Sequence, residues 1–339
     1  MTIGWGIIGI GGHANRFMAP ALGRAANTQL VAVASREMGR AEAFAVKHKA
    51  KRAYDSMERL LADPEIDVLY IATPNNLHCE ETIMAAQAGK HVYCEKPMAL
   101  TIADCERMIQ VCNDNKVKFG IDFQNRFHPA HVEARRLILS GEAGEVNVIK
   151  AQYAHGRSRN APRSTGWRNN PTVAGAGSLV GTGVHPIDLC RFLLNSEIDE
   201  IRALTDEMPP QRPVDDMAYV ILSFQNGATA VVISGVLVPR SDDDAVIYGS
   251  KMKITCRNTV GMPLRGELII EGDAVNLHET FPTEDPIPGL YIRAVEAFNK
   301  SITENTTPPA SGCDGLEMVR VVDAILESSR TGRAVKVKR

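Results

Sequence analysis

The chain has 339 residues, a net charge near −2, 44% apolar residues and 23% charged residues. This length is typical of two domains, and the composition is that of a globular protein that buries a large core without metals or disulfides. The charge gives no reason to expect nucleic acid or a membrane as partner, and no apolar run reaches the length of a membrane span. Seven scattered cysteines, without a CxxC pair or a signal-peptide pattern, lead us to expect free thiols in a cytoplasmic protein with no metal site.

Short apolar runs alternate with helical patterns over the first part of the chain, to about residue 125. Thr101 and Asp104 have the spacing of a capping box at the start of the last of these helices. Strands that alternate with helices predict a parallel sheet covered on both faces, a doubly wound Rossmann α/β domain. The expected strands are residues 5–9, 30–34, 68–72, 91–94 and 118–122, and the expected helices are residues 14–26, 40–47, 56–62, 79–88 and 101–112.

Strand-like runs dominate after residue 124, although helices are expected at 129–140, 291–301 and 314–329. Asn226-Gly227 stands between two of these runs and is a strong hairpin signal. We therefore predict an α+β second domain with a large, open, mainly antiparallel sheet, and divide the chain into domains 1–124 and 125–339. The expected strands are residues 146–153, 218–224, 228–234, 251–256 and 267–270.

A glycine-rich run, GIGGHA, follows the first expected strand and opens the first expected helix. It fits GxGxxA, in which the first glycine permits a tight turn, the second lets the backbone approach a pyrophosphate, and the last residue allows close helix packing. The N-terminus of the helix offers unpaired N–H groups to the phosphates. The alternative is a merely glycine-rich turn. The predicted dinucleotide ligands are Gly9, Gly11, Gly12, His13 and Ala14.

The end of the second expected strand bears on the choice of dinucleotide. NAD enzymes usually place Asp or Glu there to bind the ribose 2′-hydroxyl, but this strand ends in Ala34-Ser35-Arg36. A serine hydroxyl and a guanidinium can both bind a 2′-phosphate. We therefore expect NADP(H) rather than NAD(H), held by Ser35 and Arg36, with Arg40 as a further ligand. The alternative is that Arg36 is a solvated loop residue.

Glu95-Lys96-Pro97 follows the fourth expected strand, at the sheet edge where ligands bind in such domains. The ammonium group of Lys96 can polarise a carbonyl or donate a hydrogen bond to an alcohol oxygen. Pro97 shapes this turn and is a candidate for a cis bond. Taken alone, the tripeptide would be a surface turn.

The surrounding runs give this lysine a context. Residues 72–78 read ATPNNLH, residues 88–97 read AGKHVYCEKP, and residues 125–130 read NRFHPA. With these motifs the chain resembles the Gfo/Idh/MocA family, the glucose–fructose oxidoreductase and inositol dehydrogenase group, over essentially its whole length. The resemblance implies a Rossmann domain, a second domain whose sheet forms a homodimer or homotetramer, and catalysis by Lys96. The residues that it places on the cofactor side are Thr73, Asn75 and His78. Our further candidates for cofactor binding are Pro74, Glu95, Lys96 and, after the fifth expected strand, Gln124. An equal alternative for His78 is that it lies at the start of a helix and contacts no ligand.

A second glycine-rich segment carries the other candidate catalytic residue. Residues 175–188, GAGSLVGTGVHPID, resemble the family's GGGxLxDxGxHxxD segment, with His185 in the first turn of the helix that follows. An imidazole titrates near working pH, so His185 is the candidate acid/base that takes the proton of a substrate hydroxyl. The alternative is a buried structural histidine.

One position departs from the family pattern. The family usually has Asp four residues before this histidine, where this chain has Gly181, so one substrate anchor is missing. Thr182 can supply a hydroxyl to substrate but no charge. Asp188, one helical turn beyond His185, either orients the imidazole or is structural.

The remaining substrate candidates lie around these motifs. Trp167 and Arg168 form a GWR run similar to that of sugar-reducing family members, so the indole could stack on a sugar and the guanidinium bind an anion. Core packing is the alternative for Trp167. Arg126, after the fifth expected strand, is a further substrate candidate, with a domain-interface salt bridge as its alternative. The basic run at residues 155–163 would favour an acidic substrate unless it is a solvated loop.

These observations predict an NADP(H)-dependent oxidoreductase that transfers hydride to or from a carbinol carbon of a small polyhydroxylated molecule, such as a sugar, anhydro-sugar or cyclitol. A dihydrodiol dehydrogenase acting on an aromatic-derived diol is the runner-up. A catalytically weak NADP-binding regulator and a glycosidase-like enzyme with tightly bound nicotinamide are further alternatives.

Overall fold

The computed structural model describes residues 2–156, 166–206, 213–262, 264–273, 275–281 and 289–339. Contacts divide the chain into two units, Met1–Asp122 with Asp285–Val319, and Phe123–Glu284 with Arg320–Arg339. The predicted domain boundary at residue 124 assigned the whole C-terminal part to the second domain, so it did not include the segment Asp285–Val319, with which the chain returns to the first unit. The return is fixed by packing, because the buried indole of Trp5 donates a hydrogen bond of 3.0 Å to Asn299 in the returning segment.

The sheet of the first unit has six parallel strands in the order β3-β2-β1-β4-β5-β6. The order runs outward in both directions from the β1–β4 pair, which is the position where doubly wound sheets bind ligands. The five predicted strands are confirmed, and the short β3 adds an edge. The bounds are β1 Ile3–Ile8, β2 Thr28–Ala34, β3 Arg52–Tyr54, β4 Val68–Ile71, β5 His91–Cys94 and β6 Phe119–Ile121.

The helices of this unit follow the predicted pattern. The first begins with a π-helical turn, Ala14–Met18, before α1. The Thr101 hydroxyl oxygen accepts a hydrogen bond from the Asp104 N–H, which confirms the cap of α5. The helices are α1 Ala19–Leu22, α2 Met38–His48, α3 Met57–Leu61, α4 His78–Gln87, α5 Ile102–Asp114 and α9 Gly289–Thr303, and α10 Gly312–Thr331 begins in this unit.

The second unit contains a nine-stranded sheet in the order β14-β13-β12-β11-β7-β10-β9-β8-β15. Among the strands that the structure describes in this unit, only the β7–β10 pair is parallel, so the predicted mainly antiparallel sheet is confirmed. The predicted hairpin joins β9 to β10, with Gly227 at φ +89°. The bounds are β7 Val146–Ala154, β8 Ile198–Thr205, β9 Met217–Phe224, β10 Thr229–Gly235, β11 Ala245–Gly249, β12 Met252–Arg257, β13 Gly266–Gly272, β14 Asn276–Phe281 and β15 Val335–Lys336.

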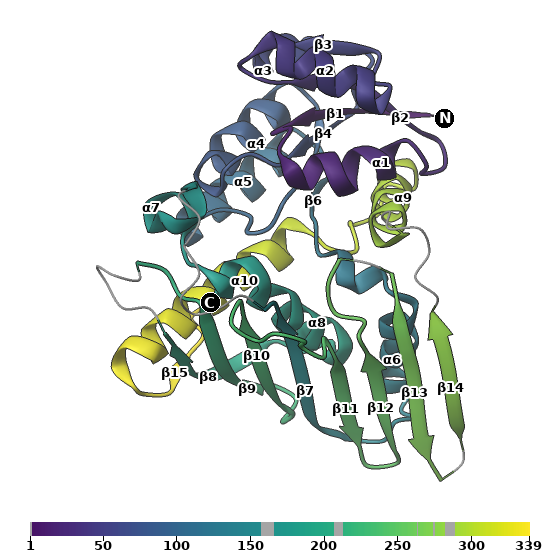
Figure 1. Ribbon diagram of the computed structural model, residues 1–339, viewed down its shortest axis with the longest axis vertical. Helices are drawn as coiled ribbons and strands as arrows, with labels where there is room; N and C mark the ends of the chain where they lie inside the picture. Colours follow the sequence, from purple (N-terminus) through teal and green to yellow (C-terminus); the bar gives the residue numbers. More distant parts are fainter. Residues whose placement is uncertain (1, 157–165, 207–212, 263, 274, 282–288) are drawn as a thin grey trace. The chain divides into compact units, whose positions relative to one another are not determined.

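Helices cover one face of this sheet (Figure 1), where α6, Pro129–Leu139, contacts β12 and α8, Val184–Leu194, contacts β7 and β10. The short helix α7, Pro171–Ala174, precedes the glycine-rich segment. The opposite face exposes apolar side chains along neighbouring strands, which is unusual for the open face of an antiparallel sheet. These side chains are Leu204, Tyr219, Ile221, Val231 and Tyr248.

Helices of the described ranges all lack the combination of length and apolarity that crossing a membrane requires.

Candidate active site

The first glycine run forms a turn that only glycine permits. Gly9 has φ +88°, and a Cβ there would lie 2.3 Å from the carbonyl carbon of Ala72 and 2.4 Å from the Thr73 nitrogen. At Gly11 and Gly12 a Cβ would meet nothing within 4 Å, so their backbone is open to a ligand. Ala14 is fully buried behind them. This arrangement fits a pyrophosphate at the start of the helix.

Glu95 is the centre of a polar cluster at the carboxyl end of β5. Its Oε1 accepts a 2.5 Å hydrogen bond from the Tyr70 hydroxyl and lies 2.8 Å from Nε2 of His13. Burial alone would raise the pKa of Glu95, but His13, the Lys96 ammonium and the Tyr70 hydroxyl together hold that pKa well below its usual range. Glu95 is therefore a carboxylate next to the candidate catalytic lysine. The side chains of His13 and Glu95, expected to contact cofactor, bind each other.

Asp122, at the end of β6, completes this cluster. Burial, and then the negative charge of Glu95, raise the pKa of Asp122 well above its usual range. The two carboxyl groups therefore carry about one negative charge between them near neutral pH. Ligand atoms of His13, Glu95 and Asp122 lie within 4.8 Å of one another, a spacing that a metal ion could use. The Lys96 charge acts on both carboxyl groups and opposes a second cation there.

His78 links the two loops that flank this cluster. Its Nδ1 lies 2.9 Å from the Pro97 carbonyl oxygen and its Nε2 lies 3.0 Å from the Thr73 carbonyl oxygen. The side chain is completely buried, so the structure assigns His78 to loop positioning instead of the expected cofactor contact. The Lys96–Pro97 bond is cis, as the sequence suggested.

The loop of Thr73, Pro74 and Asn75, after β4, contains further polar groups. The Thr73 hydroxyl donates a 2.5 Å hydrogen bond to Glu81, and burial raises the pKa of that carboxyl to about 7. Pro74 precedes the short 3-10 helix Asn75–Leu77, in which the Asn75 side chain is buried.

The loop after β2 leaves its cations exposed. Ser35 is half-buried, and its hydroxyl accepts a 3.4 Å hydrogen bond from the Glu37 N–H. No ion pair joins the exposed Arg36 to any residue within the described ranges. Arg40 lies 3.7 Å from Glu37 on the surface. An exposed guanidinium beside a serine hydroxyl is a pair of groups that can bind a phosphate.

In the second unit, His185 lies in the first turn of α8 and is 3% exposed. The preceding glycine segment is a π-helical turn, Leu179–Gly183. Gly181 is exposed, and a Cβ there would meet nothing within 4 Å. The Thr182 hydroxyl, expected to bind substrate, is buried and donates to the Ser178 carbonyl oxygen at 2.8 Å. Neither residue therefore replaces the missing carboxylate in this geometry.

Asp215 anchors this segment and was not predicted. Its carboxylate accepts hydrogen bonds from the N–H groups of Gly177 and Leu179, each at 2.7 Å, and from the Ser178 hydroxyl at 2.5 Å. A Cβ on Gly177 would lie 2.0 Å from the Asp215 carbonyl oxygen, so the segment must carry glycine there. The available signal was the Asp215-Asp216 pair before an apolar strand.

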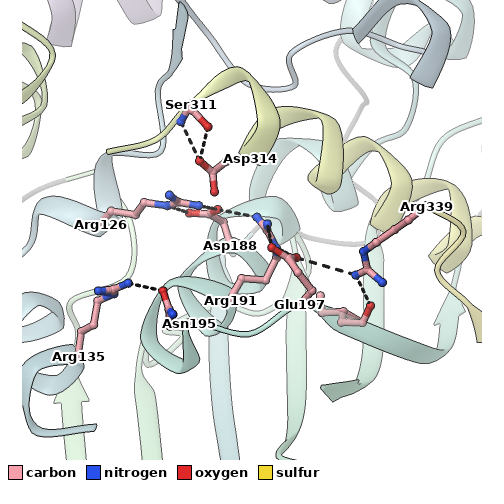
Figure 2. A network of polar contacts seen from close by, with 10 residues as sticks. Arg126, Arg135, Asp188, Arg191, Asn195, Glu197, Ser311, Asp314 and Arg339 are labelled. Carbon is pink, nitrogen blue, oxygen red and sulfur yellow. Dashed lines mark hydrogen bonds and ion pairs between the residues drawn. The ribbon is translucent and has the colours of Figure 1, made fainter. Parts of the chain in front are cut away.

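Arg126 and Asp188 form a buried ion pair (Figure 2). Nε and one terminal nitrogen of Arg126 donate to the Asp188 carboxylate at 2.8 and 2.6 Å, and Arg191 lies 3.5 Å from the same group. Arg191 also binds Glu197, which Arg339 approaches to 4.0 Å. The Arg126 guanidinium, expected to bind substrate, and the Asp188 carboxylate are thus paired with each other in this structure.

The other predicted contacts are more scattered. The Gln124 amide, expected on the cofactor side, donates to the Gly261 carbonyl oxygen at 3.3 Å within the second unit. Trp167 is half-buried, and the exposed guanidinium of Arg168 stacks over its ring at 4.5 Å. Most of the basic run, residues 157–163, lies outside the described residues.

Comparisons with known proteins identify the family of the chain. A model of the oxidoreductase family with NAD-binding Rossmann fold matches residues 3–123, and a model of the GFO/IDH/MocA C-terminal domain matches residues 131–255. The chain is 29% identical to a 1,5-anhydro-D-fructose reductase of Ensifer adhaerens, over 98% of both chains. It is 31% identical to a D-xylose 1-dehydrogenase (NADP(+)) of Haloferax volcanii, over 98% of this chain and 99% of the relative. It is also 29% identical to a trans-1,2-dihydrobenzene-1,2-diol dehydrogenase of Danio rerio, over 84% of this chain and 82% of the relative.

Solved structures give the same result. An aldose-aldose oxidoreductase from Caulobacter crescentus, complexed with glycerol, aligns with a TM-score of 0.89 at 28% identity over 99% of this chain and 100% of that chain. A levoglucosan dehydrogenase in complex with NADH and levoglucosan aligns with a TM-score of 0.87 at 25% identity over the whole of both chains. Because both domain models match in order and relatives span nearly the whole sequence, this chain belongs to the Gfo/Idh/MocA family of oxidoreductases.

Proposed function

We propose that the protein catalyses reversible hydride transfer between NADP(H) and a carbinol or carbonyl carbon of a sugar, anhydro-sugar or cyclitol. The observation that carries the proposal is Lys96, placed at the carboxyl end of β5 beside the Glu95 carboxylate. The nicotinamide supplies or accepts the hydride, and the protein must bind the reacting oxygen and move its proton.

Lys96 binds the reacting oxygen in this proposal. Its ammonium polarises a carbonyl in one direction and stabilises a forming alkoxide in the other. The neighbouring carboxylate of Glu95 favours the charged form of the lysine. His185, in the second unit, takes or returns the hydroxyl proton.

The preference for NADP(H) rests on the loop after β2. Ser35 and the exposed Arg36 offer a hydroxyl and a guanidinium to a 2′-phosphate. One relative carries NADP(+) in its name, while the levoglucosan dehydrogenase structure holds NADH, so the loop of this chain is the basis of the proposal.

We place the subunit contact of a homodimer or homotetramer on the open face of the nine-stranded sheet. Leu204, Tyr219, Ile221, Val231 and Tyr248 are each more than a third exposed there. An apolar patch of this kind on a sheet face favours burial against a second copy.

A lysine-to-methionine substitution tests the assignment of Lys96. Lys96→Met keeps much of the aliphatic stem and removes the charge, so we expect kcat to fall by about 10²–10⁴ while NADPH binding persists. Cofactor binding is followed by nucleotide fluorescence and turnover by absorbance at 340 nm. Lys116→Met is the matched control, because Lys116 is an exposed lysine in the same unit. Unchanged turnover of Lys96→Met would refute the assignment.

A diol dehydrogenase is the second candidate, supported by the trans-1,2-dihydrobenzene-1,2-diol dehydrogenase relative. NADP⁺ reduction is measured with D-xylose and levoglucosan on one side and trans-1,2-dihydrobenzene-1,2-diol on the other. A kcat/KM higher by tenfold or more for the aromatic-derived diol would transfer the proposal to that class.

A further inference from the structure

Tyr153 is an aromatic residue next to His185 that sequence patterns did not single out. It lies near the end of β7 on the face covered by α8, and it is 4% exposed. Its ring meets the imidazole of His185 edge to face, with centroids 5.6 Å apart, and meets His155 in the same way at 4.8 Å. A buried aromatic ring thus contacts the proposed acid/base directly.

The phenol hydroxyl is directed toward a glycine turn. A Cβ on Gly261 would lie 3.6 Å from the Tyr153 hydroxyl and 3.0 Å from its ring, so glycine at this turn avoids a side chain that would crowd the phenol. No hydrogen bond joins this hydroxyl to another residue in the part of the chain that the structure describes. Buried tyrosine hydroxyls usually have a partner, so this one is suited to a ligand.

The charged groups around Tyr153 keep it a phenol. Burial, followed by the negative charge of Asp243, raises the pKa of Tyr153, and Arg265 acts in the opposite direction. Asp243 itself accepts a hydrogen bond from the Ala154 N–H at 3.1 Å. The hydroxyl therefore stays protonated at neutral pH and can donate to an oxygen atom.

Other polar groups near His185 are already used within the protein. The Thr182 hydroxyl binds the Ser178 carbonyl oxygen, and Asp188 binds Arg126. Gly181 has no side chain to offer. The Tyr153 ring contacts His185, and its hydroxyl forms no hydrogen bond with another residue in the described part of the chain.

We propose that Tyr153 is a substrate-binding residue, whose hydroxyl donates a hydrogen bond to a hydroxyl oxygen of the polyol beside His185. This inference rests on the proposed function, because it takes His185 as the acid/base of a polyol reaction. It gives the site the anchor that Gly181 lacks, and it predicts that Tyr153 selects substrates with an oxygen at that position.

Tyr153→Phe removes the hydroxyl and keeps the ring against His185. With the better of D-xylose and levoglucosan, we expect KM to rise and kcat/KM to fall about tenfold, with kcat changed less than threefold and the KM for NADPH or NADP⁺ unchanged. Ser234→Ala is the matched control. Ser234 pairs with Tyr153 across β10 and β7, and its buried hydroxyl has no hydrogen-bond partner among the described residues, so its loss should leave kcat/KM within twofold.

Sugar binding, measured by calorimetry with NADP⁺ present, is the second readout. If the wild type turns over a probe and Tyr153→Phe has the same kcat/KM, the inference is overturned and the proposed function stands. If neither probe is turned over but one binds, and Tyr153→Phe weakens that binding about tenfold, the inference stands and the proposed function fails. Equal binding by both proteins, or no binding by either, overturns the inference.

Discussion

The anchor at Asp215 gives the most direct test of how the glycine segment is held. The substitution Asp215→Ala removes a carboxylate that is 2% exposed and accepts three hydrogen bonds, from the Gly177 and Leu179 N–H groups and the Ser178 hydroxyl. The two N–H groups belong to the start of the helical segment that leads to His185. Without Asp215 these donors have no partner in the native arrangement, as happens at an uncapped helix end.

The magnitude follows from these contacts. Each buried donor left without a partner costs about 1–3 kcal/mol, and losing all three would cost several kcal/mol. Part of this cost is offset, because burial raises the pKa of Asp215 and the variant no longer buries a carboxylate. We therefore expect the free energy of unfolding to fall by about 3 kcal/mol, a decrease in Tm of about 6–12 °C for a unit of this size.

Urea unfolding followed by circular dichroism measures this change, and steady-state kinetics at a temperature well below the transition measures its effect on the site. Asp199→Ala is the control, because Asp199 is a half-exposed acid of the same unit and its pair with Lys336 is long, at 3.7 Å. That variant should lose less than about 0.5 kcal/mol. Equal stability of Asp215→Ala and the control would show that the glycine segment holds its shape without the anchor.

Three further outcomes follow from the structure. Since burial holds the pKa of Glu81 at about 7 against 4.5 for an ordinary glutamate, the protonated form is favoured in the fold and stability is lost as pH rises from about 4.5 to 7. The free energy of unfolding of Glu81→Gln, measured in urea, should thus exceed that of the wild type by about 2–3 kcal/mol at pH 8 and equal it at pH 4. A difference that does not change with pH would contradict the raised pKa of Glu81. Arg36→Ala should lower kcat/KM for NADPH about tenfold or more and leave NADH unchanged, whereas equal losses would remove the 2′-phosphate assignment. The double variant Tyr219→Lys with Ile221→Lys should halve or quarter the mass measured by light scattering, and an unchanged mass would exclude this face as the contact.

The sequence was most informative where local patterns and the final structure agree. The positive φ of Gly9 follows from the strand–turn–helix motif alone, whereas the approach of Ala72 to the same glycine is seen only in the structure. Thr101 caps α5 through a contact three residues away. In both cases the relevant partners lie close in sequence or are fixed by the motif.

Long-range pairings could not be read in this way. Asp215 meets the glycine segment across more than thirty residues of chain, and the pairing depends on how β9 enters the sheet. The strand β14 was missed because all but one of its residues are exposed, which leaves no alternation of apolar and polar positions. His78 was placed on the cofactor side by the resemblance to the family, but its two ring nitrogens lie within hydrogen-bonding distance of carbonyl oxygens in two loops.

Long-range contacts also change which residue can replace the carboxylate that is missing at Gly181. From the sequence, the nearest polar residues are the natural replacements for a missing carboxylate, and Thr182 and Asp188 are the obvious choices. In the structure the Thr182 hydroxyl donates to a main-chain carbonyl oxygen, and the Asp188 carboxylate accepts from Arg126. The Tyr153 hydroxyl on β7, whose ring contacts His185, has no hydrogen-bond partner among the described residues and is the anchor that we propose. Substrate selection in this protein should accordingly depend more on the strand that faces α8 than on the helix that carries His185.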